Sequence, residues 1–374
     1  MSRPAYGWVV VAAAFTLMFV GFGAAYSFAA FFTAFQSEFG APGGVVADRV
    51  GPRRVALLGV ACLVAALWLA AEARSLAVLY ATYSIGIGVG VGLVYVPSIG
   101  AVQPWFGANR AFASGLAVAG IGAGNIAGPL LAAWWIGLFG WRGAYLALAA
   151  FVLVLGGIAA VLVRQHPAVS AGGPAAGISL RVAMRGRTFW FIYVSLVLSC
   201  VGLFVPMVHL SPYAQDAGYS EAQGVLLVSL IGLGSLLGRF TIGGVADKLG
   251  RIPSLGAMYL GLGLMLVVWW STKTWWLLAV FALVFGICYG AYVALVPTIV
   301  MDLYGARSVS GIIGTLYTGA GLGTLVGPWL AGAAFDAFGA YDVPILIAAV
   351  LSFLAAFCVI PIGRQKVEIV HRSQ

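Results

Sequence analysis

Ala246-Asp247-Lys248-Leu249-Gly250 repeats, in the second half of the chain, the pattern Ala47-Asp48-Arg49-Val50-Gly51 of the first half. Asp48 and Asp247 are 199 residues apart, and the same offset separates a second pair of patterns. This second pair consists of Gly115-x8-Gly124-x3-Gly128-Pro129 and Gly314-x8-Gly323-x3-Gly327-Pro328. So many matches at one offset indicate an internal duplication, and we expect two similar halves.

The composition places both halves in a membrane. Of the 374 residues, 63% are hydrophobic and 8% are charged, whereas soluble domains have about half and about a quarter. One helical crossing of a bilayer needs about 20 apolar residues. We therefore predict an all-α polytopic membrane protein with about eleven transmembrane helices. They cover 8–35, 55–71, 76–102, 111–136, 143–163, 188–213, 222–245, 254–272, 274–300, 308–335 and 342–362.

The longest polar connection divides the chain between the fifth and sixth predicted helices. Residues 167–177 are rich in Ala, Gly and Pro, so they are predicted to form a linker without a core. Residues 179–185 carry Leu180, Ala183 and Met184 on one helical face, as a short interfacial helix would. The expected domains are an N-terminal five-helix bundle (1–163), a cytosolic linker (164–187), a C-terminal six-helix bundle (188–363) and a cytosolic tail (364–374).

The duplication is interrupted at one place. Asp48 follows Gly40 by 8 residues, whereas Asp247 follows Gly218 by 29. The difference of 21 residues equals the length of one membrane crossing. The sequence therefore predicts that the first half lacks its second helix.

The basic residues predict the orientation. If the loops alternate sides from Asp48 onward, fourteen Lys and Arg lie on the side of Asp48 and three on the other. The positive-inside rule places the first set, including the C-terminal tail, in the cytosol of a cell-membrane protein. A single first crossing would then leave the N-terminus outside. This is unlike a complete repeat, so either the first helix inserts backwards or the chain is an incomplete twelve-helix protein.

Other functional classes have little support in the sequence. The net charge of +9 is explained by membrane orientation, so no nucleic acid partner is expected. The four cysteines are far apart and lie in apolar runs, without the spacing of a metal site. No loop carries a nucleophile with a base, so we expect no enzyme and no cofactor. The lipid bilayer is the expected surrounding of a chain that we predict to be monomeric.

Two six-helix halves with an acidic, basic and glycine turn after the second helix resemble the major facilitator superfamily of transporters. Within it, Trp105-Phe106-x3-Arg110-x2-Ala113-x-Gly115-x-Ala117-x-Ala119-Gly120 is similar to the fifth-helix signature of monocarboxylate and oxalate/formate transporters. Tyr6-Gly7-Trp8 and Tyr317-Thr318 agree with it. The resemblance implies a two-bundle carrier that works by alternating access.

The repeated turns are candidates for conformational gating. Each aspartate can pair with a basic residue of a neighbouring helix in one conformation and lose it in another, and the glycines permit a tight reversal. The alternative is a polar cap that only marks the membrane interface. The candidate residues are Asp48, Arg49, Gly51, Arg53, Asp247, Lys248, Gly250 and Arg251.

Arg239 is the clearest charge within a predicted helix. An arginine at the bilayer centre costs about 2.5–3.5 kcal/mol on insertion scales, so it indicates function. Its guanidinium suits a carboxylate, although it could instead reach the cytosolic surface or cap Asp247. The resemblance implies that Arg239 is the eighth-helix arginine that binds the substrate carboxylate.

His209 is the candidate for proton coupling, because all ten carboxylates lie at predicted helix ends or in loops. Its unperturbed pKa of about 6.5 suits a proton switch, and neutral packing is the alternative. Helix geometry places it near the outer mouth, too far from Arg239 to share one small anion. A relay or gate is therefore favoured over a second ligand.

Four tyrosines complete the predicted substrate site, Tyr95, Tyr289, Tyr292 and Tyr317. They match cavity-lining tyrosines of similar transporters, and interfacial anchoring is the alternative. The chain reads Tyr317-Thr318-Gly319-Ala320 where oxalate exchangers have a Lys after Tyr-Thr-Ala, and it has Ser235 where animal monocarboxylate carriers have an aspartate four residues before the arginine. One fixed cation matches one carboxylate.

These residues predict a secondary active transporter of small monocarboxylates of the lactate or pyruvate type. Proton symport is the favoured coupling, because carrying one negative charge inward works against a membrane potential at about 2.3 kcal/mol per 100 mV. An organic anion exchanger of the oxalate/formate type is the first alternative. A sensor or remnant that does not transport is the second, since the lost helix would normally line the cavity.

Overall fold

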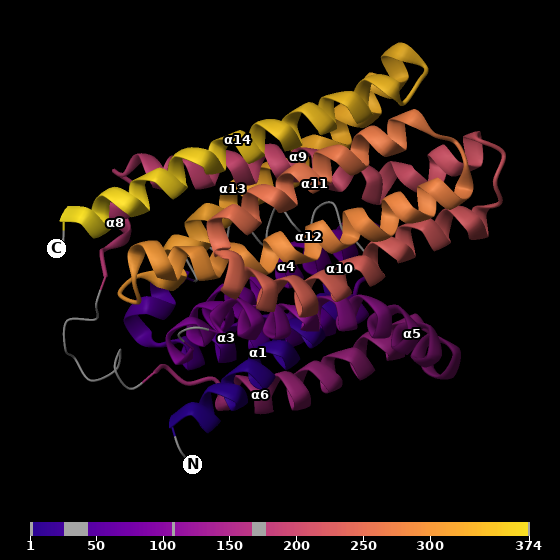
Figure 1. The fold of residues 1–374 in the computed structure, drawn as a ribbon. Helices are drawn as coiled ribbons and strands as arrows, with labels where there is room; N and C mark the ends of the chain where they lie inside the picture. The colour runs from indigo at the N-terminus through magenta and orange to yellow at the C-terminus, as the bar shows by residue number, and fades with distance from the viewer. Residues whose placement is uncertain (1–2, 26–43, 107–108, 167–176, 373–374) are drawn as a thin grey trace.

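In the computed structural model of the chain, residues 3–25, 44–106, 109–166 and 177–372 are described. They form long helices that run side by side in two groups (Figure 1). The first group contains α1 (Arg3–Ala25), α3 (Pro52–Ala71), α4 (Leu76–Val102), η2 (Gln103–Trp105), α5 (Arg110–Phe151), η3 (Val152–Gly156) and α6 (Gly157–Leu162). The second contains α9 (Arg187–Asp216), α10 (Glu221–Leu249), α11 (Arg251–Ser271), α12 (Trp275–Tyr304), α13 (Val309–Phe338) and α14 (Asp342–Arg372).

The described helices have the length and apolarity expected of membrane crossings. Nine helical segments of the described chain could span a bilayer, and Tyr6–Gly21 forms a shorter apolar helix. α5 changes direction at Gly140, whose φ of 67° and ψ of 172° are not helical. The predicted boundary between the fourth and fifth crossings, 136 to 143, falls at this kink. The all-α, membrane-spanning prediction is confirmed for the described residues.

Contacts at the start of α1 show at which end of the bundle the first helix begins. The Tyr6 hydroxyl donates to the Leu162 carbonyl at the end of α6, 3.2 Å away, and Gly7 packs against Trp105. α1 therefore begins at the same end of the bundle as the Asp48 turn, as in a complete repeat. A single first crossing would instead have placed the start of α1 at the opposite end.

The predicted loss of a helix between residues 41 and 46 falls mostly outside the described residues. Residues 44–50 are helical, and the predicted first helix continues to residue 35, whereas α1 is described only to Ala25. Residues 26–43 lie outside the described residues. In the second half the corresponding element is α10, with 29 residues.

Local chemistry sets the ends of α10, the helix that carries Arg239. Ser220 and Gln223 form a capping box at its start, which pairs two N–H groups that the helix leaves free. Glu221 in the first turn and Lys248 in the last turn complement the helix dipole. The helix ends at Gly250, whose φ of 101° is readily adopted only by glycine.

Glycine contacts join the two groups of helices. α5 lies along α10 and α12, and α4 meets α13. A Cβ atom at Gly115 of α5 would collide with the Arg239 carbonyl of α10 in the other group. Within the second group, a Cβ atom at Gly290 of α12 would collide with the Ser235 carbonyl of α10. Small residues allow such close backbone approach in membranes. This packing fixes Arg239 between α5 and α12.

The linker between the groups is partly described. Residues 167–176 lie outside the described ranges, and α8 (Leu180–Ala183) forms a single short turn where the interfacial helix is predicted. Arg181 is exposed and Ala183 is buried. The Ile178 N–H donates to the Tyr304 carbonyl, 3.0 Å away, which attaches the linker to the end of α12.

Candidate functional site

Charged groups gather at the end of the bundle where α10 and α12 finish and α5 and α13 begin. We call this the basic end, and it is the end at which the labelled termini lie in Figure 1. It carries the turns that follow Asp48 and Asp247. The gating candidates from the sequence lie at this end.

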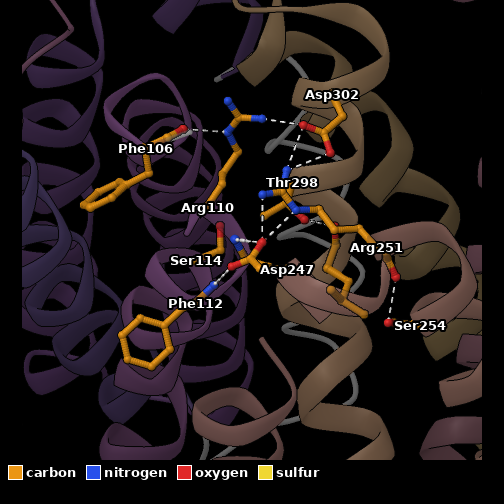
Figure 2. Close-up of polar contacts among 12 residues, drawn as sticks. Phe106, Arg110, Phe112, Ser114, Asp247, Arg251, Ser254, Thr298 and Asp302 are labelled. Carbon is orange, nitrogen blue, oxygen red and sulfur yellow. Dashed lines mark hydrogen bonds and ion pairs between the residues drawn. The ribbon is translucent and has the colours of Figure 1, made fainter. Parts of the chain in front are cut away.

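Asp247, in the last turn of α10, binds the start of α5 in the other group of helices. Its carboxylate accepts hydrogen bonds from the backbone N–H groups of Ala111 (3.2 Å) and Phe112 (3.1 Å). It also accepts from the Arg251 guanidinium at 2.7–2.8 Å (Figure 2). A carboxylate at a helix N-terminus pairs free N–H groups and favours the helix dipole.

Asp302, near the end of α12, connects two arginines. It accepts two hydrogen bonds from Arg251, at 2.7 and 2.8 Å, and forms an ion pair with Arg110 of α5 (Figure 2). Arg110 also donates to the carbonyls of Gln103 and Phe106. The Arg110 pair crosses between the two helix groups. The side chains of Arg110, Arg251, Asp247 and Asp302 are only 7–19% exposed.

Asp48, in the first group, makes the equivalent contact with a helix of the second group. It accepts from the backbone N–H groups of Ser310 (3.2 Å) and Gly311 (2.7 Å) at the start of α13. Burial raises the pKa of Asp48 from its usual 3.8 to about 6, and the N–H donors oppose this increase. Each aspartate of the duplicated turn thus binds a helix start in the other half.

These contacts hold the two groups of helices together, so the basic end is closed in this conformation. Gly51 and Gly250 adopt φ values of 94° and 101°, which accounts for both glycines. Arg49 and Lys248 are exposed, and Arg53 is half-buried. Among the described residues none of these three basic side chains forms an ion pair. The structure therefore brings Asp48, Asp247 and Arg251 into the contact network and leaves Arg49, Arg53 and Lys248 outside it.

Arg239 is buried between helices. It is 1% exposed. Its backbone lies against Gly115, and its Nη1 atom is 3.3 Å from where a Cβ of Gly122 would lie. Gly122 lies seven residues, or about 10 Å of helix rise, further from the basic end along α5 than Gly115, so the side chain extends toward the middle of the bundle. The Arg239 side chain therefore neither reaches the surface at the basic end nor caps Asp247.

The Arg239 guanidinium is incompletely paired. Its Nε and Nη1 atoms have no hydrogen-bond partner, and neither does the Ser235 hydroxyl one turn earlier on α10. The Tyr289 ring lies 5.7 Å from Cζ, which gives the cation a favourable aromatic face. Buried charged donors without an acceptor are costly, and a bound anion would satisfy them.

Tyr95 and Tyr317 meet across the two groups of helices. Their rings stack with centroids 5.5 Å apart, and the Tyr95 hydroxyl donates to that of Tyr317 at 3.2 Å. Tyr95 is within electrostatic range of Arg239. Tyr292 instead contacts Cys200 within the second group, with 3.3 Å between oxygen and sulfur. Three of the four predicted tyrosines therefore lie near Arg239 or at the contact between the groups.

His209 lies far from the basic end. Its Nε2 atom is 3.2 Å from the Pro328 carbonyl, and because a carbonyl only accepts, Nε2 must carry a proton. The ring also packs against Tyr341. Both partners belong to the second group, so the contacts of His209 with the described residues stay within that group in this conformation.

Some site residues were not predicted from the sequence. Asp302 was read only as a carboxylate at a helix end, and Arg110 only as part of a family signature. The repeat offset pairs Asp302 with Gln103, which itself bonds Ser114 at 2.6 Å beside Arg110. The equivalence of Asp302 and Gln103 in the repeat is the sequence feature that could have drawn attention to Asp302. Within the described residues, no three His, Cys, Asp or Glu side chains gather as a metal site would need.

Comparisons with known proteins agree with this architecture. Residues 4–264 and 200–369 match the family described as Major Facilitator Superfamily. The chain is 28% identical to monocarboxylate transporter 13 of Rattus norvegicus, over 92% of this chain and 86% of that protein. It is 29% identical to monocarboxylate transporter 11 of Homo sapiens, over 96% and 83%.

Solved structures share the fold at low sequence identity. The human organic anion transporter MFSD10 superposes with a TM-score of 0.76 at 17% identity, over 94% of this chain and 99% of that one. The E. coli fucose:proton symporter FucP gives 0.71 at 14% identity, over 95% of each chain. The two-bundle fold predicted from the sequence is confirmed.

Proposed function

Since the chain belongs to the Major Facilitator Superfamily and is related to the monocarboxylate transporters, we propose that it carries a small monocarboxylate of the lactate or pyruvate type. Arg239 binds the substrate carboxylate. The bundles of residues 1–163 and 188–363 rock about this site, so that it opens to one side of the membrane at a time.

The unpaired guanidinium of Arg239 is the observation that carries this proposal. Two of its nitrogen atoms lack acceptors although the side chain is 1% exposed. A carboxylate can accept both N–H groups in the planar geometry that arginine favours. One cation matches one carboxylate, which favours a monocarboxylate over a dicarboxylate. Tyr289, Tyr95 and Tyr317 line the same region.

The contacts at the basic end supply the conformational switch. Asp48 and Asp247 each bind a helix start of the other bundle, and Arg110 binds Asp302 between bundles. Opening at this end breaks all three contacts together. The Lys and Arg distribution supports a cytosolic location for this end and for the C-terminus in the cell membrane. The conformation described is therefore closed toward the cytosol.

Proton symport is the proposed coupling. A proton that travels with the anion cancels its charge and removes a cost of about 2.3 kcal/mol per 100 mV. The proposed carrier is His209, whose Nε2–H already bonds the Pro328 carbonyl between α9 and α13. Protonation of the other ring nitrogen adds a charge beside this contact, so the change can be transmitted to α13.

Uptake into proteoliposomes tests the proposal. Labelled lactate should accumulate when the outside is made acidic, without any anion inside. Arg239→Gln should abolish uptake, and Arg239→Lys should retain only a small part because it lacks the planar fork. Arg187→Gln, which removes an exposed arginine from the start of α9, is the matched control and should transport normally.

Two results would change the assignment. If accumulation requires an internal anion, the protein is an exchanger. If Arg239→Gln transports lactate as well as the unchanged protein, the substrate carboxylate is bound elsewhere and the proposal fails.

A further inference from the structure

A basic cavity lies at the surface of the first bundle, apart from the site of Arg239. Its volume is about 400 Å³, and it is formed where the turn before α3 meets the chain that follows α6. Gly51 leaves open space there, because a Cβ atom built on it would meet nothing within 4 Å. The lining residues are Val50, Gly51, Pro52, Arg53, Arg54, Val163, Arg164 and Gln165.

Three guanidinium groups give this cavity its chemistry. Arg53, Arg54 and Arg164 line it together, and no carboxylate is among the lining residues. None of the three forms an ion pair within the described part of the chain. Arg164 is positioned by the Tyr6 ring, 5.0 Å from its Cζ. Like charges brought together in a concave surface attract an anion, and arginine forks fit phosphate oxygens.

The surface next to the cavity is apolar. α3 and α6 pack against each other, and both present large exposed aliphatic side chains within about two turns of the cavity. Leu58 is 55% exposed and Ile158 is 58% exposed. The other exposed residues of this rim are Leu57, Val161 and Leu162. A soluble anion would use only the arginines, whereas a lipid would use the arginines with its headgroup and the rim with its chains.

We propose that this arginine cavity binds the phosphate headgroup of an anionic membrane lipid, with the acyl chains along α3 and α6. The volume lies within the range of small-molecule sites, about 300–1,000 Å³. Basic pockets at the headgroup level of membrane proteins bind such lipids through the same charge pairing. The site connects the Gly51 turn to the end of α6, so it is complete within the first bundle and does not depend on closure of the basic end.

Native mass spectrometry of the detergent-purified protein tests this, with phosphatidylglycerol as the probe. The triple variant Arg53→Gln, Arg54→Gln, Arg164→Gln should weaken phosphatidylglycerol binding about 125-fold, since each arginine contributes about fivefold. The single variant Arg54→Gln changes only an exposed side chain and should weaken binding about fivefold. The control removes three exposed arginines elsewhere at the basic end, Arg181, Arg185 and Arg187, and should bind normally.

Two further arms identify the ligand. Phosphatidylcholine has the same phosphate but no net charge, and it should bind at least tenfold more weakly. Inorganic phosphate at millimolar concentration should not displace phosphatidylglycerol; displacement would identify a soluble anion site and overturn the lipid assignment. Equal losses in the triple variant and the control would also overturn it, because binding would then follow surface charge alone.

Discussion

Removal of the Asp302 carboxylate should open the basic end of the transporter. Asp302→Asn keeps the size of the side chain and an oxygen acceptor but removes the charge. Asp302 holds Arg110 of the first bundle and Arg251 of the second. Without it, two guanidinium groups face each other in a partly buried site, and only Asp247 remains to offset them.

The size of the effect follows from burial. Breaking a fully buried ion pair by removing one partner costs about 3–5 kcal/mol, and an exposed pair contributes about 1 kcal/mol or less. Arg110 and Asp302 are 14% and 19% exposed, so we expect an intermediate cost of about 2 kcal/mol. This cost falls on the closed conformation, because Arg110 is released when the bundles separate. The ratio of closed to open molecules should fall by a factor of about 30.

Double electron–electron resonance spectroscopy measures this ratio directly. Spin labels on Val50→Cys and Leu249→Cys would report the separation of the bundles, in a background whose four cysteines are replaced by alanine. Both positions are exposed and equivalent in the repeat. Asp302→Asn should add a longer distance population. Asp336→Asn, an exposed carboxylate at the other end of α13, is the control and should leave the distances unchanged.

An unchanged distance distribution in Asp302→Asn would refute the reasoning. It would mean that the glycine packing between α5 and α10 keeps the end closed without the charges. A variant that remains folded, as judged by circular dichroism, is required for either conclusion.

Three further predictions concern other parts of the molecule. Asp48 has a pKa of about 6 when the basic end is closed and about 3.8 when it is solvated, so closure favours binding of a proton. As pH rises from 4 through 6, the free energy that favours the closed conformation should decrease by about 3 kcal/mol at most, and the closed population should fall. Asp48→Asn should remove this pH dependence from the same distance measurement. Gly115→Ala should lower the melting temperature in differential scanning fluorimetry, because overpacking costs about 1–3 kcal/mol, whereas Gly137→Ala enters open space and should not. His209→Gln should abolish lactate accumulation driven by a pH gradient while exchange of lactate for lactate continues; loss of both would contradict a role in proton coupling.

Much of the architecture could be predicted because it depends on local composition. Apolar runs of about 20 residues specify crossings, and the predicted boundary at 136 to 143 falls at Gly140. The repeat offset by itself indicates the Asp48 and Asp247 turns. For the first helix the sequence left two alternatives, because the Lys and Arg bias of the loops does not show how the apolar stretch of residues 8–35 crosses the bilayer.

The contacts between bundles could not be predicted in the same way. Asp247 binds backbone N–H groups of α5, and backbone groups leave no signature in a sequence. Asp302 differs from other carboxylates at helix ends only through its partners, Arg110 and Arg251, which lie 192 and 51 residues away. The depth of Arg239 could be estimated from helix rise, but its direction depends on Gly115 and Gly122 of another helix.

A binding measurement with a matched pair of ligands tests the central claim most directly. Lactate and lactamide differ only in the carboxylate, so isothermal titration calorimetry with each compares the charged group alone. The account predicts that lactate binds the purified protein and lactamide does not, and that Arg239→Gln removes the difference. Equal binding of the two ligands, or lactate binding that Arg239→Gln leaves intact, would contradict it.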